Sequence, residues 1–84
     1  MSNITEMTIS QIAGLIVADY RGRGKAVPVY AEPYVSAMRS LESVSDAYGS
    51  DSGRSIVAYA LSNLATWRGE VAKAVKAELK RRIA

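Results

Sequence analysis

The sequence predicts an all-α protein in which residues 1–84 form one domain, a compact bundle of four helices. Apolar residues recur at helical spacing in four segments, and capping residues, prolines and glycines separate these segments. The length of 84 residues fits one domain. The composition, with 49% hydrophobic and 23% charged residues, is that of a globular chain rather than a disordered one.

The first helix is expected over residues 8–21. A capping box starts it, with Thr8 at the cap and Gln11 at the third helical position. Additional apolar residues such as Leu15 widen its apolar stripe until little polar face remains. A helix of this kind is central in its bundle or covered by a second subunit, so a homodimer is one prediction. The glycines of residues 21–24 end the helix.

The second helix is expected over residues 33–47. Pro28 keeps the preceding segment extended, and Pro33 suits the first position of a helix. Arg39 and Glu42 fall on its polar side. Its apolar face would consist of Tyr34, Ala37, Met38, Leu41, Val44 and Tyr48.

The third and fourth helices are expected over residues 52–67 and 69–83, meeting at a corner near Trp67–Gly69. Asp51 or Ser52 can cap the third helix, whose apolar stripe continues as far as Trp67. A glycine at position 69 weakens helix, which predicts a break there. A single bent helix is the alternative. The apolar face of the fourth helix would be Val71, Ala72, Val75, Leu79 and Ile83.

The composition and motifs argue against catalysis. The chain has no histidine and no cysteine, so the common zinc and iron ligand sets are missing and Ser–His or Cys–His pairs cannot form. The segment GSDSG, residues 49–53, has Asp51 where a nucleophile elbow needs serine. RGRGK, residues 21–25, is followed by Ala26 instead of the Ser or Thr of a phosphate-binding loop. We therefore expect no enzyme and no cofactor.

Targeting and membrane signals are also missing from the sequence. The longest apolar run, residues 12–18, is far shorter than the roughly 20 residues of a membrane-spanning helix. The first residues, MSNITEM, lack the basic and apolar regions of a signal peptide. The expected location is the cytoplasm.

Charge is distributed unevenly along the chain. Residues 1–29 hold three basic and two acidic side chains, residues 30–53 hold one and four, and residues 54–84 hold seven and two. The net charges are therefore +1, −3 and +5, consistent with +3 for the whole chain. Such asymmetry produces a directional field that can orient a partner.

The basic residues predict contact with nucleic-acid phosphates. TWRGEVAKAVKAELKRR, residues 66–82, is amphipathic, and its cationic side suits salt-dependent binding. Alternatively, these lysines only complement the helix dipole and keep the surface hydrated. A second basic cluster follows the first helix and would join one footprint if it lay beside the fourth. The candidates are Arg68, Lys73, Lys76, Lys80, Arg81 and Arg82, with Arg21, Arg23 and Lys25 in the second cluster.

Sequence-specific recognition is disfavoured. A helix-turn-helix with Gly69 at its turn would present lysines and alanines outward, without the amide side chains that read base edges. We therefore expect sequence-nonspecific binding.

The alternative function is a protein-binding adaptor or an inhibitor of a host protein, which could be dimeric. Tyr59 falls outside the apolar stripe of the third helix and is expected to be exposed. Leu15 belongs to the excess apolar surface of the first helix, and Glu42 to an acidic edge of the second. These three residues are the candidate contacts for a partner.

Residues 48–80 resemble part of a group of small proteins. The matching elements are Tyr48-Gly49, Asp51-Ser52-Gly53-Arg54-Ser55, Thr66-Trp67-Arg68-Gly69 and Lys76-Ala77-Glu78-Leu79. This stretch resembles small uncharacterised all-helical proteins of actinobacterial phages, plasmids and integrated elements. The resemblance implies a mobile-element origin, and it brings no activity and no functional residues with it.

Overall fold

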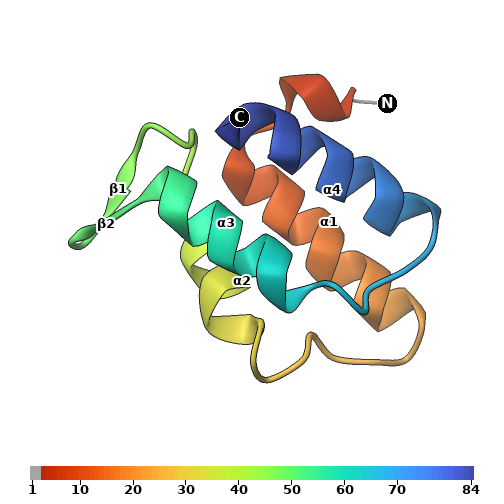
Figure 1. The fold of residues 1–84 in the computed structure, drawn as a ribbon. Helices are drawn as coiled ribbons and strands as arrows, with labels where there is room; N and C mark the ends of the chain where they lie inside the picture. Colours follow the sequence, from red (N-terminus) through yellow and green to blue (C-terminus); the bar gives the residue numbers. More distant parts are fainter. Residues whose placement is uncertain (1–2) are drawn as a thin grey trace.

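The computed structural model describes residues 3–84. Within this range the chain forms a short 3-10 helix, four α-helices and a small antiparallel hairpin (Figure 1). The elements are η1 (Ile4–Glu6), α1 (Ile9–Gly22), α2 (Glu32–Met38), β1 (Ala47–Tyr48), β2 (Asp51–Ser52), α3 (Gly53–Asn63) and α4 (Glu70–Ile83). The predicted all-α bundle is confirmed in part: the protein is mostly helical, but the two-stranded hairpin was not predicted.

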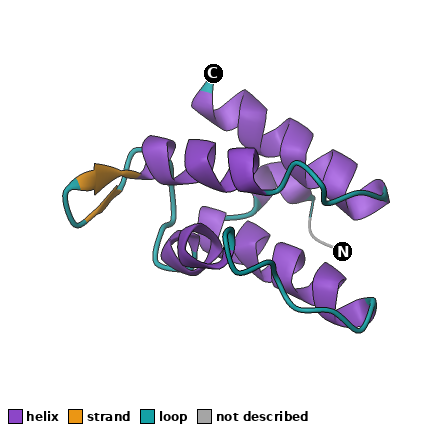
Figure 2. Cartoon of the chain, turned by 60° about the horizontal axis from the view of Figure 1, so that its bottom comes forward, coloured by secondary structure: helices purple, strands orange, loops and turns teal. Residues whose placement is uncertain are grey.

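The helices share one apolar core. Helix α1 packs against α2 and α4, and α3 packs against the same two helices. Ile12 and Ile16 of α1, Val57 of α3 and Leu79 of α4 are all completely buried. Burial of each such side chain contributes about 1.5–3 kcal/mol. The hairpin projects from one end of this helical body (Figure 2).

The start of α1 has the predicted capping box. The Thr8 hydroxyl accepts a hydrogen bond from the Gln11 N–H at 3.0 Å, and the Gln11 side chain accepts one from the Thr8 N–H at 2.8 Å. A second cap comes from far along the chain, because the N–H groups of Ile9 and Ser10 donate to the carbonyl oxygens of residues 42 and 41. The segment after α2 therefore helps to hold the start of α1.

The predicted second helix over residues 33–47 is wrong beyond Met38. Asp46 accepts the N–H groups of Glu42 and Ser43 at 2.9 and 3.1 Å, and the Ser43 hydroxyl accepts the N–H of Ser45. These local side-chain bonds compete with helical hydrogen bonding, which explains the early end of α2. The chain then forms the hairpin, so Tyr48 lies on exposed β1 and not on a helical core face.

The boundary between the third and fourth helices is confirmed, although α3 ends at Asn63 and not at residue 67. Ser52 caps α3 by accepting the Ser55 N–H at 3.1 Å. A turn follows α3, in which the Trp67 N–H donates to the Leu64 carbonyl oxygen. Gly69 precedes α4 with φ of 115°, a conformation that favours glycine. The alternative of one bent helix is wrong.

Candidate nucleic-acid interface

Trp67 fixes the corner between α3 and α4 against the end of α1. Its buried indole N–H donates to the Asp19 carboxylate at 2.8 Å, and its ring stacks on Tyr20 with centroids 5.8 Å apart. The Trp67 carbonyl oxygen accepts a hydrogen bond from Lys76 Nζ at 2.5 Å. Through this residue, α1 and α4 are both joined to the corner.

Arg23 is held at the same corner. Its guanidinium pairs with Asp19 at 3.2 Å and lies directly against Gly69, where a Cβ atom would clash with Arg23 Nη2. The glycine therefore supplies both the backbone conformation and the space that Arg23 occupies. As a result, the second basic cluster reaches the start of α4.

A recess of about 360 Å³ lies between the end of α1 and the α3–α4 corner. Arg23 and Lys25 from the second cluster share it with Arg68 from the C-terminal cluster. Its full lining is Tyr20, Arg23, Lys25, Ala26, Pro28, Thr66, Trp67 and Arg68. Three cations from the two predicted clusters therefore lie around one recess, and their use as one footprint stays a prediction.

The lysines of α4 extend this positive surface. Lys73, Lys76 and Lys80 are spaced three and four residues apart, so they lie on one side of the helix. Burial is the largest cause that lowers the pKa of Lys76, and the charges of Lys80 and Arg68 lower it further. Lys76 is therefore close enough to Lys80 and Arg68 to be repelled by both. We call the six residues Arg23, Lys25, Arg68, Lys73, Lys76 and Lys80 the cationic belt.

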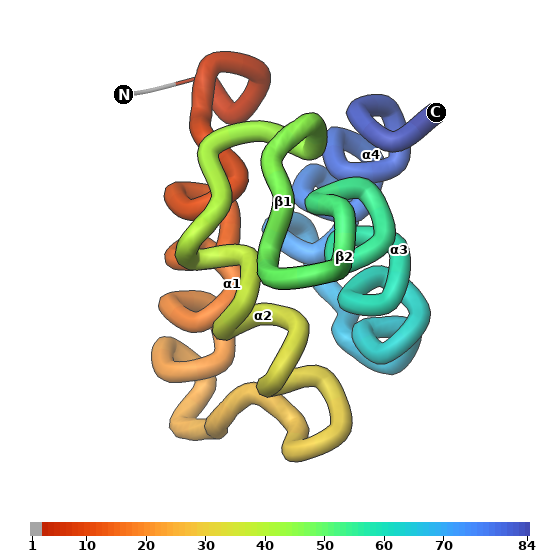
Figure 3. The backbone as a smooth tube through the Cα atoms, turned by 90° about the vertical axis from the view of Figure 1, so that its left-hand side faces the viewer, coloured from red at the N-terminus to blue at the C-terminus, as the bar shows by residue number. Residues whose placement is uncertain are grey.

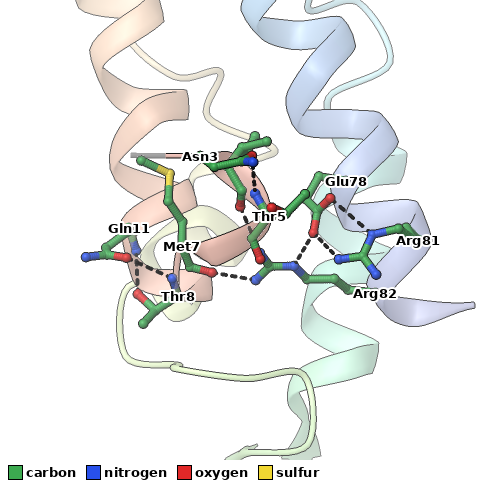
Figure 4. A network of polar contacts seen from close by, with 9 residues as sticks. Asn3, Thr5, Met7, Thr8, Gln11, Glu78, Arg81 and Arg82 are labelled. Atoms are coloured by element: carbon green, nitrogen blue, oxygen red, sulfur yellow. Dashed lines mark hydrogen bonds and ion pairs between the residues drawn. The ribbon is translucent and has the colours of Figure 1, made fainter. Parts of the chain in front are cut away.

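The structure gives Arg82 a different role from the predicted phosphate contact. Its guanidinium donates to the carbonyl oxygens of Met7 and Ile4 at 2.7 and 2.9 Å, and to that of Thr5 at 3.2 Å (Figure 4). Its Nε also donates to Glu78 at 2.6 Å, and its side chain is only 15% exposed. Arg82 therefore ties η1 to the end of α4, and the two segments lie side by side in Figure 1. Figure 3 views the molecule from the side of the hairpin, with α1 to the left and α3 and α4 to the right.

Arg81 is also outside the belt. It remains 63% exposed, but its guanidinium makes two hydrogen bonds to Glu78, at 2.5 and 3.1 Å. The hydrogen bond from Arg81 is the largest cause that lowers the pKa of Glu78 to about 2; burial opposes it, and Arg82 adds to it. Glu78 is thus ionised at neutral pH, and the two arginines share its single negative charge.

Arg21 lies apart from Arg23 and Lys25. It lines a separate recess of about 290 Å³ between α1 and α2, together with Glu32 and Arg39. The mixed charges of this second recess are less suited to an anion than those of the belt. Of the three cations predicted in the second cluster, two therefore reach the belt.

The three candidate partner contacts have different surroundings. Tyr59 is 52% exposed, as expected, and its ring packs on Tyr34 with centroids 5.5 Å apart. Leu15 is partly buried against the core, so it does not supply the expected excess apolar surface. Glu42 is exposed but lies in the turn after α2, so the predicted acidic edge of a long helix does not form.

Sequence analysis missed Tyr30. It is 55% exposed, and its hydroxyl lies 3.5 Å from that of Thr66, a lining residue of the cationic recess. Its position after Pro28, in a segment expected to be extended, was the available signal. No local pattern identifies Thr66 as its neighbour, since 36 positions separate them.

Comparison of the chain with protein-family models, with curated proteins and with solved structures found no match. The resemblance of residues 48–80 to mobile-element proteins therefore stays a prediction. Over residues 3–84, no helix is long and apolar enough to cross a membrane. The same part of the chain has no group of three or more acidic side chains arranged to hold a metal ion.

Proposed function

We propose that this protein is a non-catalytic, cytoplasmic nucleic-acid-binding protein that contacts phosphates through the cationic belt. The observation that carries the proposal is the recess in which Arg23 and Lys25 meet Arg68. Residues more than 40 positions apart in the sequence thereby form one positive surface with the lysines of α4.

The charge of the belt is largely uncompensated. Within the described residues, the ion pair found for a belt member is that between Arg23 and Asp19. Lys73 and Lys80 are exposed on α4. Exposed lysines and arginines neutralise phosphates and release condensed counterions, which drives binding at low salt.

The belt holds the nucleic-acid backbone without distinguishing one base sequence from another. Lysine acts as a mobile point charge, and arginine can hold two phosphate oxygens at once. Sequence readout would require side chains placed against base edges in a groove. Binding by the belt is therefore sequence-nonspecific.

A titration of fluorescently labelled DNA tests the proposal. We expect measurable binding to generic DNA at about 50 mM salt, with much weaker binding at about 200 mM. The double variant Lys73→Gln/Lys80→Gln should bind roughly ten-fold more weakly, because two phosphate contacts are lost. Arg81→Gln, which removes an exposed cation outside the belt, is the matched control and should bind like the wild type.

The result that contradicts the proposal is an absence of binding to DNA and RNA at low salt. A loss of binding free energy per removed charge that is as large in Arg81→Gln as in the double variant would also contradict it, since net charge rather than the belt would then determine affinity.

A protein-binding adaptor or inhibitor is the second candidate. Exposed apolar side chains favour it, with Val29 and Tyr30 on the loop before α2 and Tyr59 on α3. Light scattering and affinity capture distinguish this candidate: a monomer that retains no partner protein would argue against it.

A further inference from the structure

We infer that the ligand of the cationic belt is single-stranded nucleic acid, with its bases stacked on exposed tyrosines beside the recess. This inference rests on the proposed function and narrows it to one class of nucleic acid. The observation behind it is the position of the tyrosines, which the charge pattern alone does not reveal.

Three tyrosines lie along the junction between α2 and α3. Tyr34 of α2 packs on Tyr59 of α3 with ring planes 38° apart. Four residues before Tyr34, the hydroxyl of Tyr30 meets that of Thr66, which lies beyond the end of α3. These two contacts connect the same two segments of the chain, so the tyrosines follow one line. We call Tyr30, Tyr34 and Tyr59 the tyrosine strip.

The strip runs directly into the cationic belt. Thr66, the neighbour of Tyr30, lines the recess that contains Arg23, Lys25 and Arg68. Tyr20, on the wall of that recess, also lies near Tyr30: burial is the largest cause that raises the pKa of Tyr20, and Tyr30 raises it further. Through Tyr30, the tyrosine strip thus reaches the rim of the recess that contains these cations.

The rings of the strip can accept bases. Tyr30 and Tyr59 expose about half of their surface, whereas Trp67 is buried and cannot serve as a stacking platform. Aromatic side chains stack on any base, since every base has a π face, while adjacent cations follow the backbone. The strip and belt together provide both interactions.

A duplex cannot use this surface fully. Its bases are stacked on one another and present only their edges in the grooves, so a tyrosine ring cannot reach their faces. A single strand can turn its bases toward the tyrosines while its phosphates contact the belt. The three recess cations complement the negative charge of a nucleic-acid backbone. They therefore favour this ligand over an apolar peptide.

The experiment compares three labelled probes: a DNA strand of about 12 nucleotides, the duplex of the same sequence, and an abasic strand of equal length. The wild type should bind the intact strand about ten-fold more tightly than the duplex, and about a hundred-fold more tightly than the abasic strand, which loses stacking on both Tyr30 and Tyr59. Tyr30→Ala and Tyr59→Ala should each weaken binding to the intact strand by about ten-fold and leave the abasic strand unaffected.

Two controls accompany these variants. Tyr30→Phe keeps the ring and should bind like the wild type, which separates stacking from the hydroxyl contact with Thr66. Tyr48→Ala removes an exposed tyrosine on the hairpin, at the opposite end of α3 from the recess, and should also have no effect. The comparison of probes on the wild type needs no variant, so a poorly folded variant does not prevent the test.

The inference is overturned if the duplex or the abasic strand binds as tightly as the intact strand. It is also overturned if Tyr59→Ala leaves DNA binding unchanged but dissociates a dimer in light scattering, because the strip would then be a contact between copies. Failure of the proposed function gives a different result, which is absence of binding to all three probes.

Discussion

Glu78 is a carboxylate that is only 6% exposed, and its oxygens accept hydrogen bonds from Arg81 and Arg82. Burial of an acid is costly unless the charge is paired and hydrogen-bonded, and this site satisfies both conditions. Arg82 also donates hydrogen bonds to three carbonyl oxygens of the N-terminal segment. Glu78 therefore orients the side chain that links the two ends of the chain.

The lowered pKa of Glu78 predicts acid sensitivity. Its value is about 2 in the folded protein and 4.5 ordinarily, so the stabilising contribution is fully present above about pH 4.5. The contribution decreases as pH falls from about 4.5 towards 2, because the unfolded chain takes up the proton first. Glu78→Gln should lower the free energy of unfolding by about 2 kcal/mol at pH 7 and by much less near pH 2. Urea denaturation at both pH values measures this.

Glu42→Gln is the control for this measurement, since its side chain is exposed in the turn after α2. It should change stability by less than about 0.5 kcal/mol at either pH. A Glu78→Gln variant as stable as the wild type at pH 7 would contradict the role assigned to the carboxylate.

Single residues also show where sequence-based reasoning stops. The spacing of Lys73, Lys76 and Lys80 on one helix side follows from helical periodicity alone. Arg82 also belongs to that basic segment, but the three carbonyl oxygens to which it donates lie 75 to 78 positions away along the chain. Helical periodicity places Arg82 near the apolar stripe of its helix. Hydrogen bonds of such long range depend on tertiary packing, so the sequence does not reveal which carbonyl oxygens this guanidinium binds.

At the scale of elements, helix starts were predicted better than helix ends. Side-chain caps at Thr8 and Ser52 are local and can be read directly from the sequence. The end of α2 is harder to identify, because Leu41 remains in helical register with Met38 and is still buried after the helix has ended. The turn at Asp46 brings Leu41 into the core without a helix, so apolar periodicity overstated the length of α2.

Gly53 is required where β2 passes into α3. A Cβ atom there would lie 2.9 Å from the Asp46 carbonyl oxygen and 3.0 Å from those of Ser43 and Val44. Gly53→Ala should therefore lower the free energy of unfolding by about 1–3 kcal/mol, because the turn must shift to admit a methyl group. Thermal and urea denaturation measure the change.

Gly14→Ala is the matched control, because nothing lies within 4 Å of the Cβ position at that site in α1. Alanine should stabilise this helix by about 0.5–1 kcal/mol. If both alanine variants changed stability in the same direction, the assigned role of the carbonyl oxygens around Gly53 would be wrong.

At the scale of the whole molecule, the fold separates opposite charges. The hairpin and the turn before it contain Asp46 and Asp51 at the start of α3, whereas the recess with Arg23, Lys25 and Arg68 lies at the opposite end of α3 (Figure 1). A molecule with separated positive and negative regions orients itself in the field of a charged partner. This arrangement favours an orientation in which the protein approaches a polyanion with the cationic belt facing it.

The salt dependence of binding tests the central claim most directly. The logarithm of the association constant for a labelled single strand, plotted against the logarithm of salt concentration, has a slope set by the number of neutralised phosphates. The slope should become shallower by about 1.4 in Lys73→Gln/Lys80→Gln and stay unchanged in Arg81→Gln, because about 0.7 is lost per phosphate contact. A slope near zero in the wild type, or one that the double variant leaves unchanged, would contradict phosphate binding by the cationic belt.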